Sequence, residues 1–311
     1  MFFCAYHRRR LPGWDMLARS ATVWIMAMPD RRVSGAIGAA LMLAAVLCLS
    51  SAAQAQVPIL KAQASPAAKP EMKAEFCPGF VAGNRPRVIP AALSADQVRI
   101  TFIGHATFLI ESPKLVRIAT DYNDYVRPPI VPDIATMNHA HTTHYTEHPD
   151  PAIKHLLRGW RDDGKPAGWD VTYQDVRVRS VATNIRDWNG GTQRNGNSIF
   201  VFEIGNLCIA HLGHLHHTLT QSQLDEIGRV DVVMVPVDGS WTMDLEGMAE
   251  VLQALKAQVM IPMHYFSMGT LNRFLDRVRD KYEVEMHDTP SIVVSRGVLP
   301  PKPKFLVLPG R

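Results

Sequence analysis

Three histidines stand close together in Asn138-His139-Ala140-His141-Thr142-Thr143-His144, directly after a short apolar run that ends at Met137. Side chains two residues apart share one face of an extended segment, and a residue three further on returns to that face when the chain enters a first helical turn. Neutral imidazole is the commonest protein ligand for zinc and related ions. The H-x-H-x-x-H spacing therefore predicts half of a metal site at a strand-to-helix junction. The alternative interpretation is a solvated polar loop that is rich in histidine.

Further chemically active side chains follow the ends of other predicted strands. His214, Asp238 and His264 each lie just beyond such an end, where the loops of a sheet-built domain converge. Eight of the 13 histidines fall within residues 139–148 and 211–217. For His214 and His264 taken singly, the alternative is a core histidine with a satisfied hydrogen bond. Taken together, the pattern predicts a metal site whose ligands are His139, His141, His144, His214 and His264.

The order of the predicted elements indicates the fold class. Alternation predicts strands over residues 98–103, 106–111, 115–120 and 171–181, and a hairpin that turns at Gly205-Asn206. A capping box at Thr220–Gln223 opens a helix, and buried strands over 231–237 and 259–264 then alternate with helical spacing over 248–255 and 271–278. An antiparallel meander followed by strand–helix units predicts an α/β domain of two mixed sheets faced with helices.

Composition and the N-terminal residues suggest an exported protein. The chain has 311 residues, of which 47% are hydrophobic and 20% charged, as in soluble globular proteins. A basic segment, an apolar run over 36–49 and an A-x-A site that ends at Ala55 predict a secretory signal. The run is shorter than the roughly 20 residues of a transmembrane helix, so we expect no stable membrane insertion after cleavage. We predict a leader over 1–55, a flexible segment over 56–92, one domain over 93–311, and a periplasmic or secreted location.

The charge gives no support for a nucleic-acid partner. The formal charge of +4 includes six arginines within the first 32 residues, which would leave with the leader. We therefore expect a small-molecule substrate and no binding to nucleic acid.

Seven motifs occur along the chain in an order that resembles the metallo-β-lactamase superfamily. Within this superfamily, they resemble the branch that contains L-ascorbate-6-phosphate lactonase and N-acyl-phosphatidylethanolamine phospholipase D. The resemblance implies an αββα sandwich with a metal centre on its open edge. It also implies that His105 and Asp121 support the ligands and that His217 is a site histidine. The motifs are 104–111, 120–121, 138–144, 197–200, 211–214, 235–239 and 261–265.

The chain departs from this family pattern at several positions. Thr143 stands where the family has a metal-binding aspartate, and His214 replaces the aspartate that bridges two metals. The family histidine expected near residues 184–186 is missing. Asp238 stands where relatives have glycine, and we predict that it acts as a replacement base or as an acceptor beside the ligands; the alternative is a turn residue that caps the following loop. An all-imidazole site favours one or two Zn²⁺ ions over Fe²⁺ or Mn²⁺.

The leading functional hypothesis is an exported metal-dependent hydrolase, in which a metal-bound hydroxide attacks a lactone, an ester or a phosphodiester. Asp238 and His217 are the predicted catalytic residues. The alternative is a non-catalytic member that binds a metal or another ligand. Hydrolysis requires an open metal position, whereas a closed four-histidine site would be structural.

Overall fold

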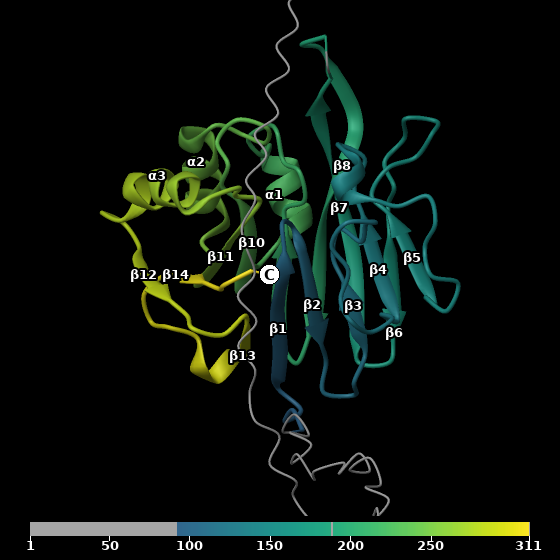
Figure 1. The fold of residues 1–311 in the computed structure, drawn as a ribbon, viewed down its shortest axis with the longest axis horizontal. Coiled ribbons are helices and arrows are strands. Elements are labelled where there is room, and N and C mark those ends of the chain that lie inside the picture. The colour runs from purple at the N-terminus through teal and green to yellow at the C-terminus, as the bar shows by residue number, and fades with distance from the viewer. Residues whose placement is uncertain (1–91, 188, 311) are drawn as a thin grey trace, which may run out of the picture. The chain divides into compact units, whose positions relative to one another are not determined.

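The computed structural model describes residues 92–187 and 189–310, and it consists of two facing β-sheets with helices on one side (Figure 1). The expected leader over 1–55 and nearly all of the segment over 56–92 lie outside the described residues, so both stay predictions. Within the described part of the chain, we find no helix that is long and apolar enough to cross a membrane.

The first sheet has six strands. Its spatial order is β13 (Ser291–Ser295), β1 (Gln97–Gly104), β2 (Thr107–Glu111), β3 (Arg117–Ala119), β4 (Ile134–Met137) and β5 (His155–Arg158). Strand β2 pairs antiparallel with both β1 and β3, and β4 pairs parallel with β3 and β5. Strands β1, β3 and β4 therefore run in the same direction and end at the same edge.

The second sheet has eight strands. Its order is β12 (Glu283–Met286), β14 (Lys304–Val307), β11 (Val259–Met263), β10 (Val232–Pro236), β9 (Leu207–His211), β8 (Thr192–Ile204), β7 (Val176–Arg186) and β6 (Asp170–Tyr173). Strands β9, β10 and β11 are parallel, as expected for strands joined through helical crossovers. Their carboxyl ends therefore lie together.

Each face of the eight-stranded sheet has its own core. Alternate residues of both sheets, among them Phe102, Phe108, Phe200 and Ile261, form the layer between the sheets. The other face of the second sheet packs against α1 (Gln221–Ile227), α2 (Leu245–Leu255) and α3 (Met268–Val278). Apolar side chains spaced by three and four residues give α2 and α3 this buried face.

The predicted sandwich of two mixed sheets is confirmed, and so are the hairpin at Gly205-Asn206 and the capping box of α1. Two features differ from the prediction. All three α-helices of the described residues pack on the eight-stranded sheet, whereas the six-stranded sheet carries a small cluster around Met137 and Trp160. The alternating run over 171–181 is two strands, because Gln174 takes a positive φ of 53° and reverses the chain.

Candidate metal centre

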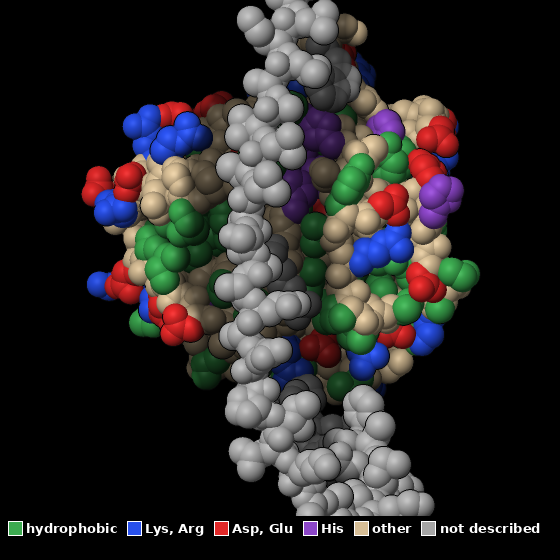
Figure 2. Space-filling model, viewed as in Figure 1, with side chains coloured by type: hydrophobic (Ala, Val, Ile, Leu, Met, Phe, Trp, Pro, Cys, Tyr) green, Lys and Arg blue, Asp and Glu red, His purple; other side chains and the backbone are tan. Residues whose placement is uncertain are grey.

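A group of histidines and aspartates gathers where strands of both sheets end. His105 follows β1, Asp121 follows β3, and the 3₁₀-helix η1 (Thr142–His144) follows β4. In the other sheet, His214, Asp238 and His264 follow β9, β10 and β11. Because these six strands end at the same side of the sandwich, residues up to 159 positions apart in sequence meet there. Figure 2 shows histidine side chains set into a recess on this face of the molecule.

The centre of the group is the pair His144 and His264, whose Nε2 atoms lie 3.2 Å apart. Each ring is held at its other nitrogen by a carboxylate: Nδ1 of His144 lies 2.7 Å from Asp121 Oδ2, and Nδ1 of His264 lies 3.1 Å from Asp238 Oδ1. A carboxylate accepts, so each Nδ1 carries the proton and each Nε2 presents a lone pair. Burial lowers the pKa of His144 well below its usual range, which keeps this ring neutral.

This geometry fits a metal ion. Two imidazole nitrogens that bind one tetrahedral zinc at about 2.0–2.1 Å each are roughly 3.3–3.4 Å apart. The observed 3.2 Å between the two Nε2 atoms agrees with this separation. Two buried lone pairs that face each other without a proton between them are unfavourable unless a cation lies between them.

His105 completes a group of three. One ligand atom from each of His105, His144 and His264 lies within 4.8 Å of the others. The Nε2 atom of His105 is buried and has no hydrogen-bond partner among the described residues. Burial, reinforced by the neighbouring His264, lowers the pKa of His105 to about 3. Its ring is therefore neutral near pH 7 and can bind a metal. The resemblance gave His105 only a supporting role, whereas its position suits direct coordination.

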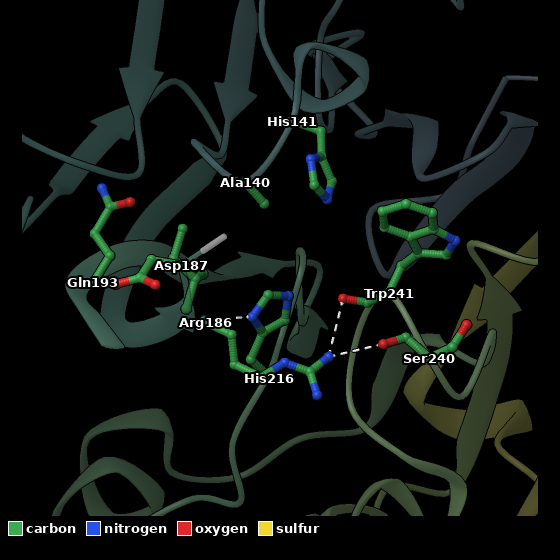
Figure 3. Close-up of a pocket in the computed structure, with 9 residues that line it drawn as sticks. Ala140, His141, Arg186, Asp187, Gln193, His216, Ser240 and Trp241 are labelled. Carbon is green, nitrogen blue, oxygen red and sulfur yellow. Dashed lines mark hydrogen bonds between the residues drawn. The ribbon is translucent and has the colours of Figure 1, made fainter. Parts of the chain in front are cut away.

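His214 and His141 border the same space. The His214 ring is perpendicular to the rings of His144 and His264, with centroids 4.7 and 4.8 Å away. Its Nε2 is buried and has no partner within the described part of the chain. His141 is half-buried, lies 4.8 Å from the His214 ring centroid, and points into the neighbouring pocket (Figure 3).

His139 is not brought to this group, which corrects the predicted ligand set. Its ring stacks on Trp160 with centroids 4.9 Å apart, and its Nδ1 lies 3.1 Å from the Gln193 amide nitrogen. The expectation assumed an extended chain through residue 141. Strand β4 instead ends at Met137, and residues 139–141 bend, so the side chains of 139 and 141 diverge.

Buried amides hold the carboxylate behind His144. The Asn138 side chain donates to Asp121 Oδ1 at 2.9 Å and accepts from the Ser198 backbone N–H at 2.8 Å, thereby linking the two sheets. Burial raises the pKa of Asp121 to about 6, although the neighbouring His211 and the hydrogen bond from Asn138 act in the opposite direction. Positive φ angles at His105, Asp121 and His264, of 53°, 42° and 56°, place backbone strain at this edge, as is common at functional sites.

Asp238 lies beside His264 as an acceptor, which is one of the two roles predicted for it; the other, as a base, stays a prediction. Its carboxylate accepts backbone N–H groups of Ser240, Trp241 and Thr242 and lies against His264 Nδ1. Burial alone would raise the pKa of Asp238, but these donors hold it well below its usual range. These contacts fix the carboxylate against the His264 ring, as expected of an acceptor beside a ligand.

The pocket beside the group contains an unpredicted arginine. It has a volume of about 200 Å³ and is lined by residues that include His141, Arg186, His216 and Trp241 (Figure 3). The Arg186 guanidinium donates to the carbonyls of Ser240 and Trp241, at 2.8 and 3.3 Å, and so fixes the loop after β10. No sequence pattern predicts this contact, because the partners are main-chain atoms more than 50 residues away.

His217, a predicted catalytic residue, lies at the margin. Its ring centroid is 6.4 Å from that of His216, and we find no ring contact with His105, His144 or His264 in the described residues. Burial, with the neighbouring Arg186, lowers the pKa of His217. Its Nε2 is buried and has no hydrogen-bond partner among the described residues, and its catalytic role stays a prediction.

Comparison with known proteins identifies the family of this chain. The sequence profile of the β-lactamase superfamily domain matches residues 99–264, which is more than half of the chain and includes the histidine group. The chain belongs to the metallo-β-lactamase superfamily. It is 27% identical over 191 residues to a protein of Thermoplasma acidophilum named as a metal-dependent hydrolase, an alignment that covers 55% of this chain and 84% of the relative.

Other superfamily members show the same relation. A protein of Methanosarcina mazei, also named as a metal-dependent hydrolase, is 21% identical over 223 residues, which cover 64% of this chain and 96% of the relative. A solved structure from Thermotoga maritima, described as a candidate zinc-dependent hydrolase of the superfamily, is 29% identical with a TM-score of 0.51. That match covers 69% of this chain and the whole of the other.

Proposed function

We propose that this chain is a metal-dependent hydrolase whose centre holds one divalent ion between His105, His144 and His264. The observation that carries the proposal is the 3.2 Å approach of two Nε2 atoms, each on a ring whose Nδ1 faces a buried carboxylate. Superfamily relatives named as metal-dependent hydrolases support the same class of reaction.

The donor set supports one ion rather than two. Thr143 offers no carboxylate where the family pattern has an aspartate, and His139 stacks on Trp160 instead of joining the group. A second ion would lack these two ligands. Neutral imidazoles suit Zn²⁺ best, with Fe²⁺ and Mn²⁺ as weaker alternatives because these metals favour more oxygen ligands.

The surrounding residues would position the ion and the substrate. A bound divalent ion would supply the electrophile that acidifies water and polarises the bond to be cleaved. Asp121 and Asp238 orient the ligand rings through their Nδ1 atoms, a role for which partners of this kind are common in metal sites. Rings held in this way lose little freedom when the ion binds.

The proposed substrate is a small lactone, ester or phosphodiester, as the resemblance to the lactonase and phospholipase branch suggests. The pocket beside the histidine group would receive this substrate, and His141, His216 and Trp241 are among the residues that line it (Figure 3). Half of the Trp241 side chain is exposed, so it offers an apolar surface to a substrate at the entrance.

The proposal is tested by metal uptake and turnover together. Metal-free protein would be loaded with Zn²⁺, Mn²⁺ or Fe²⁺ and assayed with a panel of esters, lactones and phosphodiesters. We expect turnover in at least one class, and we expect His264→Ala to lose both the ion and turnover. His148→Ala is the matched control, because His148 is exposed and away from the group. A parent that holds the ion but cleaves nothing in the panel would favour the non-catalytic alternative.

We also propose that the protein is exported and processed after Ala55. The support is the basic segment, the apolar run and the A-x-A site in the sequence. Mass spectrometry of protein from the periplasmic fraction should give an N-terminus at Gln56. An intact leader on protein from the cytosolic fraction would overturn this proposal.

A further inference from the structure

A short chain of hydrogen bonds ends at His214. The Arg186 backbone N–H donates to His216 Nδ1 at 2.6 Å (Figure 3), and His216 Nε2 lies 2.6 Å from His214 Nδ1. The last atom of the chain, His214 Nε2, is buried beside His144 and His264 and has no partner among the described residues.

The first donor fixes every proton that follows. A backbone N–H only donates, so His216 Nδ1 must present a lone pair, and the proton of His216 lies on Nε2. That N–H donates to His214 Nδ1, which is therefore also a lone pair. The proton of a neutral His214 is then on Nε2, the atom that faces the metal centre.

His144 and His264 have the opposite arrangement. Their Nδ1 atoms face the carboxylates of Asp121 and Asp238, which only accept, so their Nε2 atoms are lone pairs. A ring nitrogen that carries a proton cannot bind a metal, whereas a lone pair can. The three rings are neighbours, but the group bonded to Nδ1 differs. A carboxylate leaves a lone pair on Nε2 of His144 and His264, whereas the His216 N–H leaves a proton on Nε2 of His214.

We propose, on the basis of the proposed function, that His214 is not a metal ligand and that its Nε2–H donates a hydrogen bond to an oxygen of the substrate at the ion. This assignment replaces the ligand role expected from the sequence. A buried donor directed at a developing negative charge stabilises the transition state, and removal of one such donor lowers kcat by about 10²–10³-fold in other hydrolases. His216 and the Arg186 backbone are positioning groups that set this proton.

The proton positions are measurable without any metal. In ¹⁵N-labelled, metal-free protein, two-bond correlations from the ring carbons should identify His214 and His216 as Nε2–H tautomers, and His144 and His264 as Nδ1–H tautomers. His216→Gln should leave His214 unchanged, because an amide accepts from Arg186 with its oxygen and donates to His214 with its nitrogen. His216→Glu should move the His214 proton to Nδ1, because a carboxylate accepts from both. An Nδ1–H tautomer of His214 in the parent would overturn the proposal.

Zinc titration tests whether His214 is a metal ligand. We expect His214→Gln to bind Zn²⁺ with the stoichiometry and, within about threefold, the affinity of the parent, whereas His144→Gln should weaken binding by about a hundredfold or more. His214→Ala should lower kcat far more than it changes the zinc affinity, and His214→Gln should retain part of the activity because it keeps an N–H donor. An equal loss of zinc in His214→Gln and His144→Gln would overturn the inference and leave the proposed function standing. A parent that takes up no divalent ion would overturn both.

Discussion

His144 and His264 stand 120 residues apart in the sequence, yet their Nε2 atoms lie 3.2 Å apart. The two rings are nearly parallel, with 12° between their planes, and each comes from the end of a strand in a different sheet. The sandwich thus supplies the two halves of the proposed centre from its two layers. Because a carboxylate lies behind each ring, small changes behind the ligands should affect metal binding.

The carboxylate behind His144 gives the first prediction. Asp121→Asn keeps the shape of the side chain but removes the charge that orients His144 and balances a cation. We expect zinc affinity to fall by about 10–100-fold while the far-UV circular dichroism spectrum is retained. The control is Asp163→Asn, which changes a carboxylate paired with Arg161 on the surface. Equal zinc affinity in the parent and Asp121→Asn would contradict the assigned role.

Asp238→Asn should lower the free energy of unfolding in addition to weakening the hold on His264. The carboxylate accepts the backbone N–H groups that close the loop over residues 240–242, and an amide offers a single acceptor atom in place of two. We expect urea unfolding to report a loss of about 1–3 kcal/mol, the usual cost of leaving buried donors without acceptors. If the residue were instead the general base, the variant would lose turnover at unchanged stability.

Gly213 gives a prediction about the packing beneath His214. Its φ is 60°, and an added Cβ would lie 2.4 Å from Asn197 Oδ1 and 2.5 Å from Asn138 Nδ2. Gly164 has a similar φ of 71° but nothing within 4 Å of an added Cβ. Gly164→Ala should therefore cost only the backbone strain, about 1–2 kcal/mol, and Gly213→Ala should cost clearly more. Equal unfolding free energies for the two variants would show that the asparagines move aside.

The pH dependence of stability follows from the buried histidines. Burial lowers the pKa of His105 to about 3 and that of His216 to about 4, from an ordinary value of 6.5. Below pH 6.5 the unfolded chain binds protons that the folded chain does not, so the unfolding free energy should fall as the pH is lowered from 7 toward 4. Urea titrations of metal-free protein at several pH values measure this. His216→Gln should make the dependence shallower, and an identical dependence would contradict the low pKa of His216.

The fold was accessible from the sequence because local patterns agree with one another. The alternating run of β1, the turn at Gly205-Asn206 and the helical spacing of α2 each predict the element that forms. The strands near the C-terminus were missed: β12 is an exposed strand with a Glu-Val-Glu-Met sequence, whose polar residues give no buried face. Its place beside β14 depends on a long-range pairing that no local pattern encodes.

The site was accessible in outline, since the histidines predicted after β4, β9 and β11 do lie at one edge. Which histidines converge depends on the path of the backbone after each strand, and the spacing of histidines in the sequence does not determine that path. His139 diverges from His141 because the chain bends after Met137, and His105 joins the group because a positive φ turns it toward His264. The nitrogen of His214 that carries the ring proton depends on the backbone N–H of Arg186. The amino-acid sequence does not predict where this backbone group lies.

The metal content of purified protein shows directly whether the His144–His264 pair binds an ion. Protein produced with zinc in the medium, desalted and measured by inductively coupled plasma mass spectrometry, should contain one equivalent of divalent metal per chain. The same measurement on His264→Ala should give close to none. A parent without metal that also takes up no Zn²⁺, Mn²⁺ or Fe²⁺ on titration would contradict the account, because two facing Nε2 lone pairs would then have no ion to bind.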